Sequence, residues 1–138
     1  MNQKIINECR AFVEQIGPML ARYDALLTVY EETTKQRDSL TQECGQFSVG
    51  QAFEIIPTSK DEKVLSSAGK LTAVMRRMHE IHDEMQGLDA EFLARIDASR
   101  NSIEILTAVA LQSNKRPYVR CREAEHSVKA ALAVVQAG

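Results

Sequence analysis

The sequence is poor in the residues that build sheets and turns. Its 138 residues include no Trp, four Phe and three Tyr, and only six Gly and three Pro. A β-sandwich or barrel needs many β-branched and aromatic strand positions with frequent turn residues, so this composition argues against both folds. The hydrophobic fraction of 44% is still enough for one domain with a core. We therefore expect a single helical domain over residues 1–138.

Cysteine is also scarce, and no apolar run is long. The three Cys lie at positions 9, 44 and 121, with no Cys-x-x-Cys spacing, so neither a disulfide framework nor a zinc site is indicated. No stretch approaches the roughly 20 apolar residues of a membrane span. The first ten residues, MNQKIINECR, lack the apolar core of a secretory signal. These absences together predict a cytoplasmic protein without a membrane span.

The main positive signal is an apolar position at alternating steps of three and four residues. It runs in phase from Ile5 to Cys44, which places these residues on one helical face and predicts a long helix over about 2–45. Gly17-Pro18 interrupts the segment without shifting the phase, so we interpret it as a kink rather than a turn. Residues 46–58 follow no helical period and are expected to form an apolar loop.

A second helix is predicted over about 59–113. Ser59 and Glu62 form a capping box at its start, and its apolar stripe, which includes His82, runs from Ala68 to Ala110. Gly87 could instead end one helix and begin another, giving a compact four-helix bundle. Because the apolar phase holds across Gly87, we favour one long helix. Pro117 suits the first turn of a third helix over about 117–137.

These lengths predict an elongated antiparallel three-helix bundle or coiled coil, with two long helices and one short C-terminal helix. The last helix is long enough to cover only about 20 residues of the second one, roughly 92–112. The apolar surface near 71–88 is then left without a cover, unless the loop 46–58 folds back over it. A protein partner or a second copy of the chain would cover the same surface. The expected contacts are Val74, Met78, Ile81, Met85 and Leu88, with Phe47, Phe53 and Ile55 in the loop.

Charge is unevenly distributed along the chain, whose formal net charge is −2. The C-terminal segment is basic and holds one cluster, Lys115, Arg116, Arg120 and Arg122. Such a cluster could contact phosphates, which makes a nucleic-acid-associated helical subunit the alternative hypothesis. The overall acidic balance disfavours a dedicated nucleic-acid binder.

Sequence motifs of catalysis are sparse. No P-loop, Gly-x-Gly-x-x-Gly, Gly-x-Ser-x-Gly or His-Glu-x-x-His occurs. We interpret His79 as a surface residue and His82 as a polar residue within the apolar stripe that packs in a coiled coil. Neither is expected to be a metal ligand. The run His126-Ser127-Val128-Lys129-Ala130 resembles the His-x-x-Lys-Gly core of histidine phosphotransfer domains, with Ala130 in place of the Gly. That resemblance implies His126 as a phosphoacceptor beside Lys129.

The sequence as a whole predicts a non-enzymatic structural or adaptor subunit that assembles with other proteins through helical surfaces. No catalytic residue, metal ligand or cofactor is expected.

Overall fold

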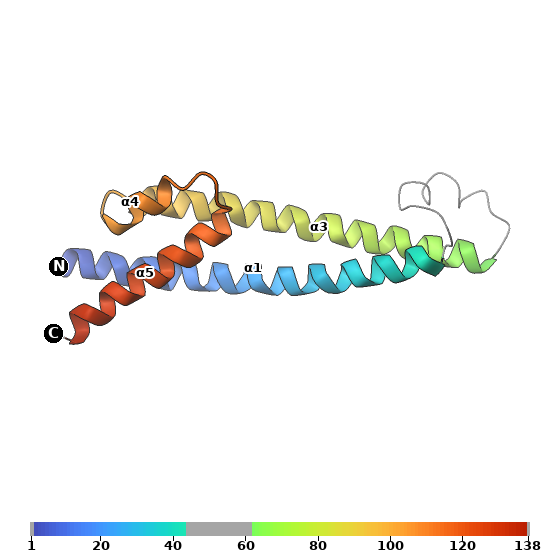
Figure 1. Ribbon diagram of the computed structural model, residues 1–138, viewed down its shortest axis with the longest axis horizontal. Helices are drawn as coiled ribbons and strands as arrows, with labels where there is room; N and C mark the ends of the chain where they lie inside the picture. The colour runs from blue at the N-terminus through green and yellow to red at the C-terminus, as the bar shows by residue number, and fades with distance from the viewer. Residues whose placement is uncertain (1, 44–61, 138) are drawn as a thin grey trace. The chain divides into compact units, whose positions relative to one another are not determined.

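A computed structural model describes residues 2–43 and 62–137, and in these ranges the chain is helical with no strand. The two long helices are α1 (Gln3–Glu43) and α3 (Glu62–Ser99). A short helix, α4 (Ile105–Ala110), precedes α5 (Pro117–Ala137), as Figure 1 shows. The all-helical class with two long helices is thus confirmed. Among these helices, none is at once long and apolar enough to cross a lipid bilayer.

The chain divides into two compact units. Unit 1 comprises Met1–Ala25 and Met85–Gly138, and unit 2 comprises Leu26–Glu84. Both α1 and α3 contribute to each unit, whereas α4 and α5 belong to unit 1 alone. The three-helix bundle remains a prediction.

Helix α1 begins where the side chain of Asn2 accepts a hydrogen bond from the backbone N–H of Ile5, at 2.9 Å. Asn is a favoured N-cap because its oxygen replaces a missing intrahelical partner. Pro18 lies inside α1 and does not end it, in agreement with the unbroken apolar phase. Most positions that the repeat selects in unit 1 are buried, among them Phe12, Ile16 and Tyr23.

Helix α3 passes through Gly87 without a break but ends at Ser99, which corrects the predicted helix over 59–113. The chain leaves the helix through Arg100–Glu104, where the N–H of Ile103 bonds to the carbonyl of Ser99 at 2.8 Å. The run Ser-Arg-Asn-Ser at 99–102 favours this exit, since Ser and Asn side chains compete for backbone hydrogen bonds. The predicted start at Ser59 lies outside the described residues.

The core of unit 1 centres on Phe92 of α3, which is fully buried. The ring of Phe92 lies 5.8 Å from that of Tyr23 on α1 and 6.3 Å from that of Tyr118 on α5. On the next turn of α5, the thiol of Cys121 faces the carbonyl oxygen of Phe92 at 3.6 Å. Helix α5 crosses the N-terminal part of α1 obliquely (Figure 1), so three helices enclose this core.

The core of unit 2 is thinner, because its described part consists of one segment of α1 and one of α3. Leu26, Leu71, Met78 and Ile81 are buried in it. Two polar side chains are buried as well, Thr33 and Ser67. The hydroxyl of Ser67 donates to the carboxylate of Glu43 at 3.1 Å and so links the two segments.

The sequence predicted that His82 would lie within the packed apolar stripe. This prediction is wrong, because the side chain of His82 is exposed. The neighbouring Ile81 is fully buried instead. The physical reason is a rotation of the buried face by one residue, which places the aliphatic side chain inward and leaves the imidazole in water.

Candidate partner-binding groove

A shallow groove of about 580 Å³ lies between the α1 and α3 segments of unit 2. Side chains from both helices form its walls and floor: Lys35, Gln36, Ser39, Leu40, Lys70, Ala73 and Val74. It is the hollow that contains a predicted partner contact, Val74.

Helical spacing places these side chains together. Gln36 and Leu40 are four residues apart on α1, as are Lys70 and Val74 on α3, so each pair shares one face of its helix. Leu40 and Val74 are each half-buried and form the apolar floor. Ala73 adds only a methyl group, which leaves room above that floor.

The groove is positively charged at its walls. Lys35 and Lys70 line it from opposite helices, and none of the lining residues is an Asp or Glu. Neither lysine forms an ion pair within the part of the chain that the structure describes. Among the described residues, both ammonium groups thus lack a carboxylate partner.

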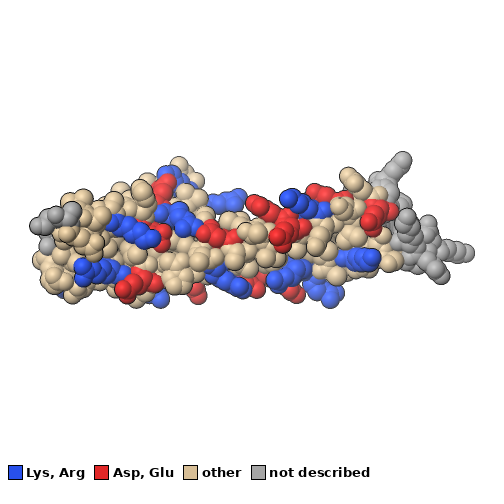
Figure 2. All heavy atoms as spheres, turned by 90° about the horizontal axis from the view of Figure 1, so that it is seen from below, with Lys and Arg blue, Asp and Glu red and all other residues tan. Residues whose placement is uncertain are grey.

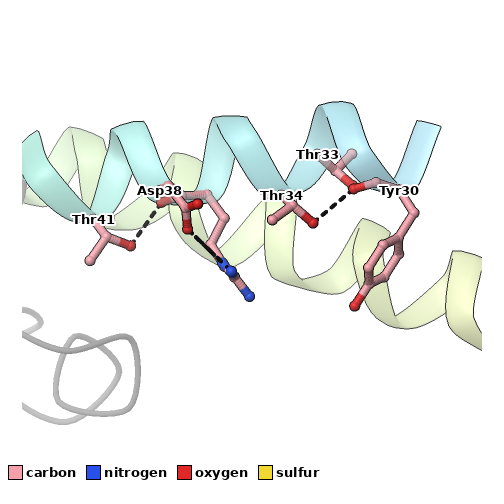
Figure 3. Close-up of polar contacts among 6 residues, drawn as sticks. Tyr30, Thr33, Thr34, Asp38 and Thr41 are labelled. Atoms are coloured by element: carbon pink, nitrogen blue, oxygen red, sulfur yellow. Dashed lines mark hydrogen bonds and ion pairs between the residues drawn. The ribbon is translucent and has the colours of Figure 1, made fainter. Parts of the chain in front are cut away.

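The polar groups of α1 in unit 2 are largely satisfied within the helix itself. The hydroxyl of Thr34 donates to the carbonyl of Tyr30 at 2.9 Å, and that of Thr41 to the carbonyl of Arg37 at 2.8 Å (Figure 3). Arg37 pairs with its neighbour Asp38 at 3.1 Å. Because these groups already have partners, they do not compete for a ligand of the groove.

The predicted partner contacts fall into three classes. Met78 and Ile81 are buried by the chain itself, which corrects the expectation that this surface is left uncovered. Val74 in unit 2, and separately Met85 and Leu88 in unit 1, are half-buried and retain some exposed surface. The predicted loop contacts lie outside the described residues: Phe47, Phe53 and Ile55.

The basic cluster at the start of α5 is mostly engaged within the chain. Lys115 pairs with Glu123 at 2.8 Å, and Arg120 donates to the backbone carbonyl of Lys115. Arg122 pairs with Asp24 of α1. Arg116 is exposed. On the face shown in Figure 2, basic and acidic side chains are interspersed, which is unlike the basic stripe of a phosphate-binding surface.

The contacts of Asp24 form a cluster in unit 1 that the sequence analysis missed. Tyr118 and Arg122 both donate hydrogen bonds to the Asp24 carboxylate, and the Arg122 guanidinium lies 5.4 Å from the centre of the Tyr118 ring. Tyr118 also stacks on Tyr23 with ring centres 4.4 Å apart. The only signal for this cluster in the sequence was the four-residue spacing of Tyr118 and Arg122, which places both side chains on the same face of a helix. The cluster fastens α5 to α1.

Of the candidate chemical residues, His126 is exposed and lines a surface hollow of α5 together with Lys129. No group of His, Cys, Asp and Glu in the described ranges could hold a metal ion. His79 pairs with Asp83 at 3.6 Å on the surface of α3. In Cys9, burial and the nearby Glu8 raise the thiol pKa. In Cys121, burial foremost and then Asp89 raise the thiol pKa to about 12. Both thiols are thereby kept in the unreactive protonated form.

A second hollow, of about 710 Å³, lies in unit 1 beneath the turn between α3 and α4. Its floor includes the buried side chains of Cys9, Ile103 and Val128. Arg100 and Glu104 both line it, so the two opposite charges cancel and give no preference for a charged ligand. Of the two hollows, the groove of unit 2 therefore has the stronger preference for a negatively charged ligand.

Comparison of the chain with protein-family models, with curated proteins and with solved structures gave no match in any of the three.

Proposed function

We propose that the chain is a non-enzymatic structural or adaptor subunit, which assembles with another protein through its helical surfaces. The bundle or coiled-coil packing expected from the apolar repeat is part of this proposal, as is a cytoplasmic location. The partner is either a different protein or a second copy of the chain.

The supporting observation is the partly exposed apolar floor of the groove in unit 2, formed by Leu40 and Val74. Burying a complete aliphatic side chain stabilises by roughly 1.5–3 kcal/mol, so covering the smaller part of Leu40 and Val74 that is still exposed contributes less than about 1 kcal/mol each. Helices normally bury such a stripe against another element. Within the described ranges, unit 2 supplies two helical segments and no third one.

The alternative function, a subunit of a nucleic-acid-associated complex, has less support. Of its four predicted contacts, Lys115 and Arg122 already pair with carboxylates of the chain. A phosphate would have to displace those carboxylates, which weakens any gain from the new contact. Arg116 is the member of the cluster that is exposed.

The experiment isolates the chain from its native host after chemical cross-linking and determines the mass of the complex. We expect a stoichiometric complex with the unaltered chain and its loss with Val74→Asp, because the partner would have to cover a charged carboxylate in place of an apolar side chain, which costs its desolvation. Val134→Asp is the matched control, since Val134 of α5 is 74% exposed.

A chain that is monomeric and cross-links to nothing in stoichiometric amount would refute the proposal. So would a complex that Val74→Asp leaves intact. Bound nucleic acid that is lost with Arg116→Glu, together with an intact protein complex in Val74→Asp, would favour the alternative.

A further inference from the structure

We infer that the groove of unit 2 receives an acidic amphipathic helix, whose apolar side chain sits on Leu40 and Val74 and whose carboxylates pair with Lys35 and Lys70. This inference rests on the proposed function and names the chemistry of its partner.

The charge of the walls selects an acidic occupant. One lysine lines the groove from each helix, so both helical segments contribute a positive group beside the apolar residues. Neither lysine has an ion-pair partner within the described ranges, and no Asp or Glu lines the groove. A basic or neutral occupant would leave both ammonium groups unpaired at the edge of a buried contact, which disfavours it.

The shape of the walls selects a helix. Both walls are helices, and an amphipathic helix typically lays its apolar stripe into a groove of this kind. In the incoming helix, residues three or four positions away from the central apolar residue lie on the same face as that residue. Carboxylates at the borders of that face would reach the two walls.

Unit 1 provides an internal example of the same chemistry. There α5 buries three apolar side chains, Cys121, Ala124 and Val128. Arg122 of the same helix pairs with Asp24 of α1, so α5 combines buried apolar side chains with an ion pair to another helix. In unit 2 the cations stand on the receiving helices, and no described residue that lines the groove is an Asp or Glu, so the proposed incoming helix supplies the carboxylates.

The test uses fluorescent peptides and the full chain. The probe is a helical peptide of roughly 18 residues, about five turns, with Leu at every third or fourth position and Glu on both borders of the Leu stripe. The matched peptide carries Lys in place of each Glu. Binding is followed by fluorescence anisotropy at low salt and at 0.5 M salt, where exposed ion pairs are screened at a Debye length below about 8 Å.

We expect the unaltered chain to bind the Glu peptide about tenfold more tightly than the Lys peptide, because two exposed ion pairs together change the affinity by up to about 25-fold. In the double variant Lys35→Glu with Lys70→Glu, the preference reverses in favour of the Lys peptide. High salt reduces the preference in both chains.

The control is the double variant Lys4→Glu with Arg76→Glu. It makes the same change in net charge on the same two helices, at exposed positions outside the groove. We expect it to keep the preference of the unaltered chain. A reversal in this control as well would overturn the inference, because net charge would then explain the result.

Failure of the inference and failure of the proposed function give different results. If the charge variants bind both peptides alike while Val74→Asp abolishes the complex isolated from the host, the groove is an interface and the acidic partner is wrong. If neither peptide saturates the unaltered chain up to about 1 mM, an affinity of only about 4 kcal/mol, the inference is also overturned.

Discussion

Tyr118 on α5 donates a hydrogen bond from its hydroxyl to the carboxylate of Asp24 on α1, across 94 residues of sequence. Arg122, one turn further along α5, donates to the second oxygen of the same carboxylate and to the Tyr118 hydroxyl. The carboxylate therefore connects two helices that are far apart in the chain. Its protonation state sets part of the stability of unit 1.

Replacing Asp24 by Asn is expected to destabilise the fold at neutral pH and to lose this effect in acid. Burial by itself raises the pKa of Asp24, but the hydrogen bonds from Tyr118 and Arg122 outweigh it and lower the pKa. A lowered pKa stabilises above the unfolded value of about 3.9, and the contribution is lost as the pH falls through the folded value. The carboxylate is partly exposed, so we expect a loss of about 1 kcal/mol at pH 7.

Urea unfolding of both chains at pH 7 and pH 3 measures this difference. The exposed Asp97→Asn variant serves as the control and should match the unaltered chain at both pH values. A destabilisation by Asp24→Asn that is equally large at pH 3 would contradict the assignment.

Phe92→Ala is expected to be the most damaging of the substitutions considered. The ring is fully buried and contacts Tyr23 and Tyr118, so its removal leaves a cavity that costs about 3–5 kcal/mol. The adjacent Leu93 is 37% exposed, and Leu93→Ala should cost less than about 1 kcal/mol. Thermal unfolding followed by circular dichroism compares the stability of the two variants. Similar losses of stability in both would mean that Phe92 is not at the centre of the core.

Gly87→Ala is expected to stabilise the chain. A Cβ at this position meets no other atom within 4 Å, and α3 continues through it. Glycine in a helix interior costs about 0.5–1 kcal/mol relative to alanine, so the substitution should recover that amount. The midpoint of urea unfolding measures the gain. A clear loss would instead indicate that Gly87 ends a helix in a left-handed conformation.

The thiols of Cys9 and Cys121 are expected to resist alkylation in the folded chain. Cys44 lies outside the described residues, so the measurement uses a Cys44→Ser background. With the Cys121 pKa at about 12, roughly one molecule in ten thousand carries the thiolate at pH 8. Iodoacetamide labelling followed by mass spectrometry should show slow reaction in buffer and rapid double labelling in urea. Rapid labelling of either residue in buffer would mean that it is accessible.

Arg122→Glu should destabilise unit 1, whereas Arg116→Glu should not. The first substitution places a carboxylate beside Asp24 and Glu125, with a loss of about 1–2 kcal/mol. Arg116 is exposed, so its reversal is expected to change stability by less than about 0.5 kcal/mol. Urea unfolding of the two variants tests whether Arg122 serves the fold. Equal stability of both would return Arg122 to the set of candidate anion contacts.

Much of the helical structure could be predicted from apolar spacing. The repeat from Ile5 onward identified α1 because a buried stripe repeats every 3.5 residues, and Pro117 marked the start of α5. The same repeat concealed the end of α3, since Ile103 and Leu106 remain buried beyond it. Phase alone therefore does not prove that a helix is continuous. The polar run at Ser99–Ser102 was the better signal.

The candidate groove could be predicted only in part. Val74 was found because it belongs to the apolar surface near 71–88, which the C-terminal helix is too short to cover. Lys35 and Lys70 were not predicted as groove residues. They line the same groove only because of the way α1 and α3 pack in unit 2, which the sequence pattern does not give. Likewise, the sequence did not predict that Ile81 is buried and His82 exposed. The two arrangements differ by a rotation of the helix through one residue position, and the apolar stripe of the sequence is too wide to distinguish them.

The stacking of Tyr23 on Tyr118 has a practical consequence in a chain without tryptophan. Of its three phenol rings, these two touch inside unit 1, and the third, Tyr30, belongs to unit 2. Near-ultraviolet absorption and emission are therefore dominated by tyrosine. Replacing Tyr30 by Phe would give an optical signal that follows the opening of unit 1 without any added label.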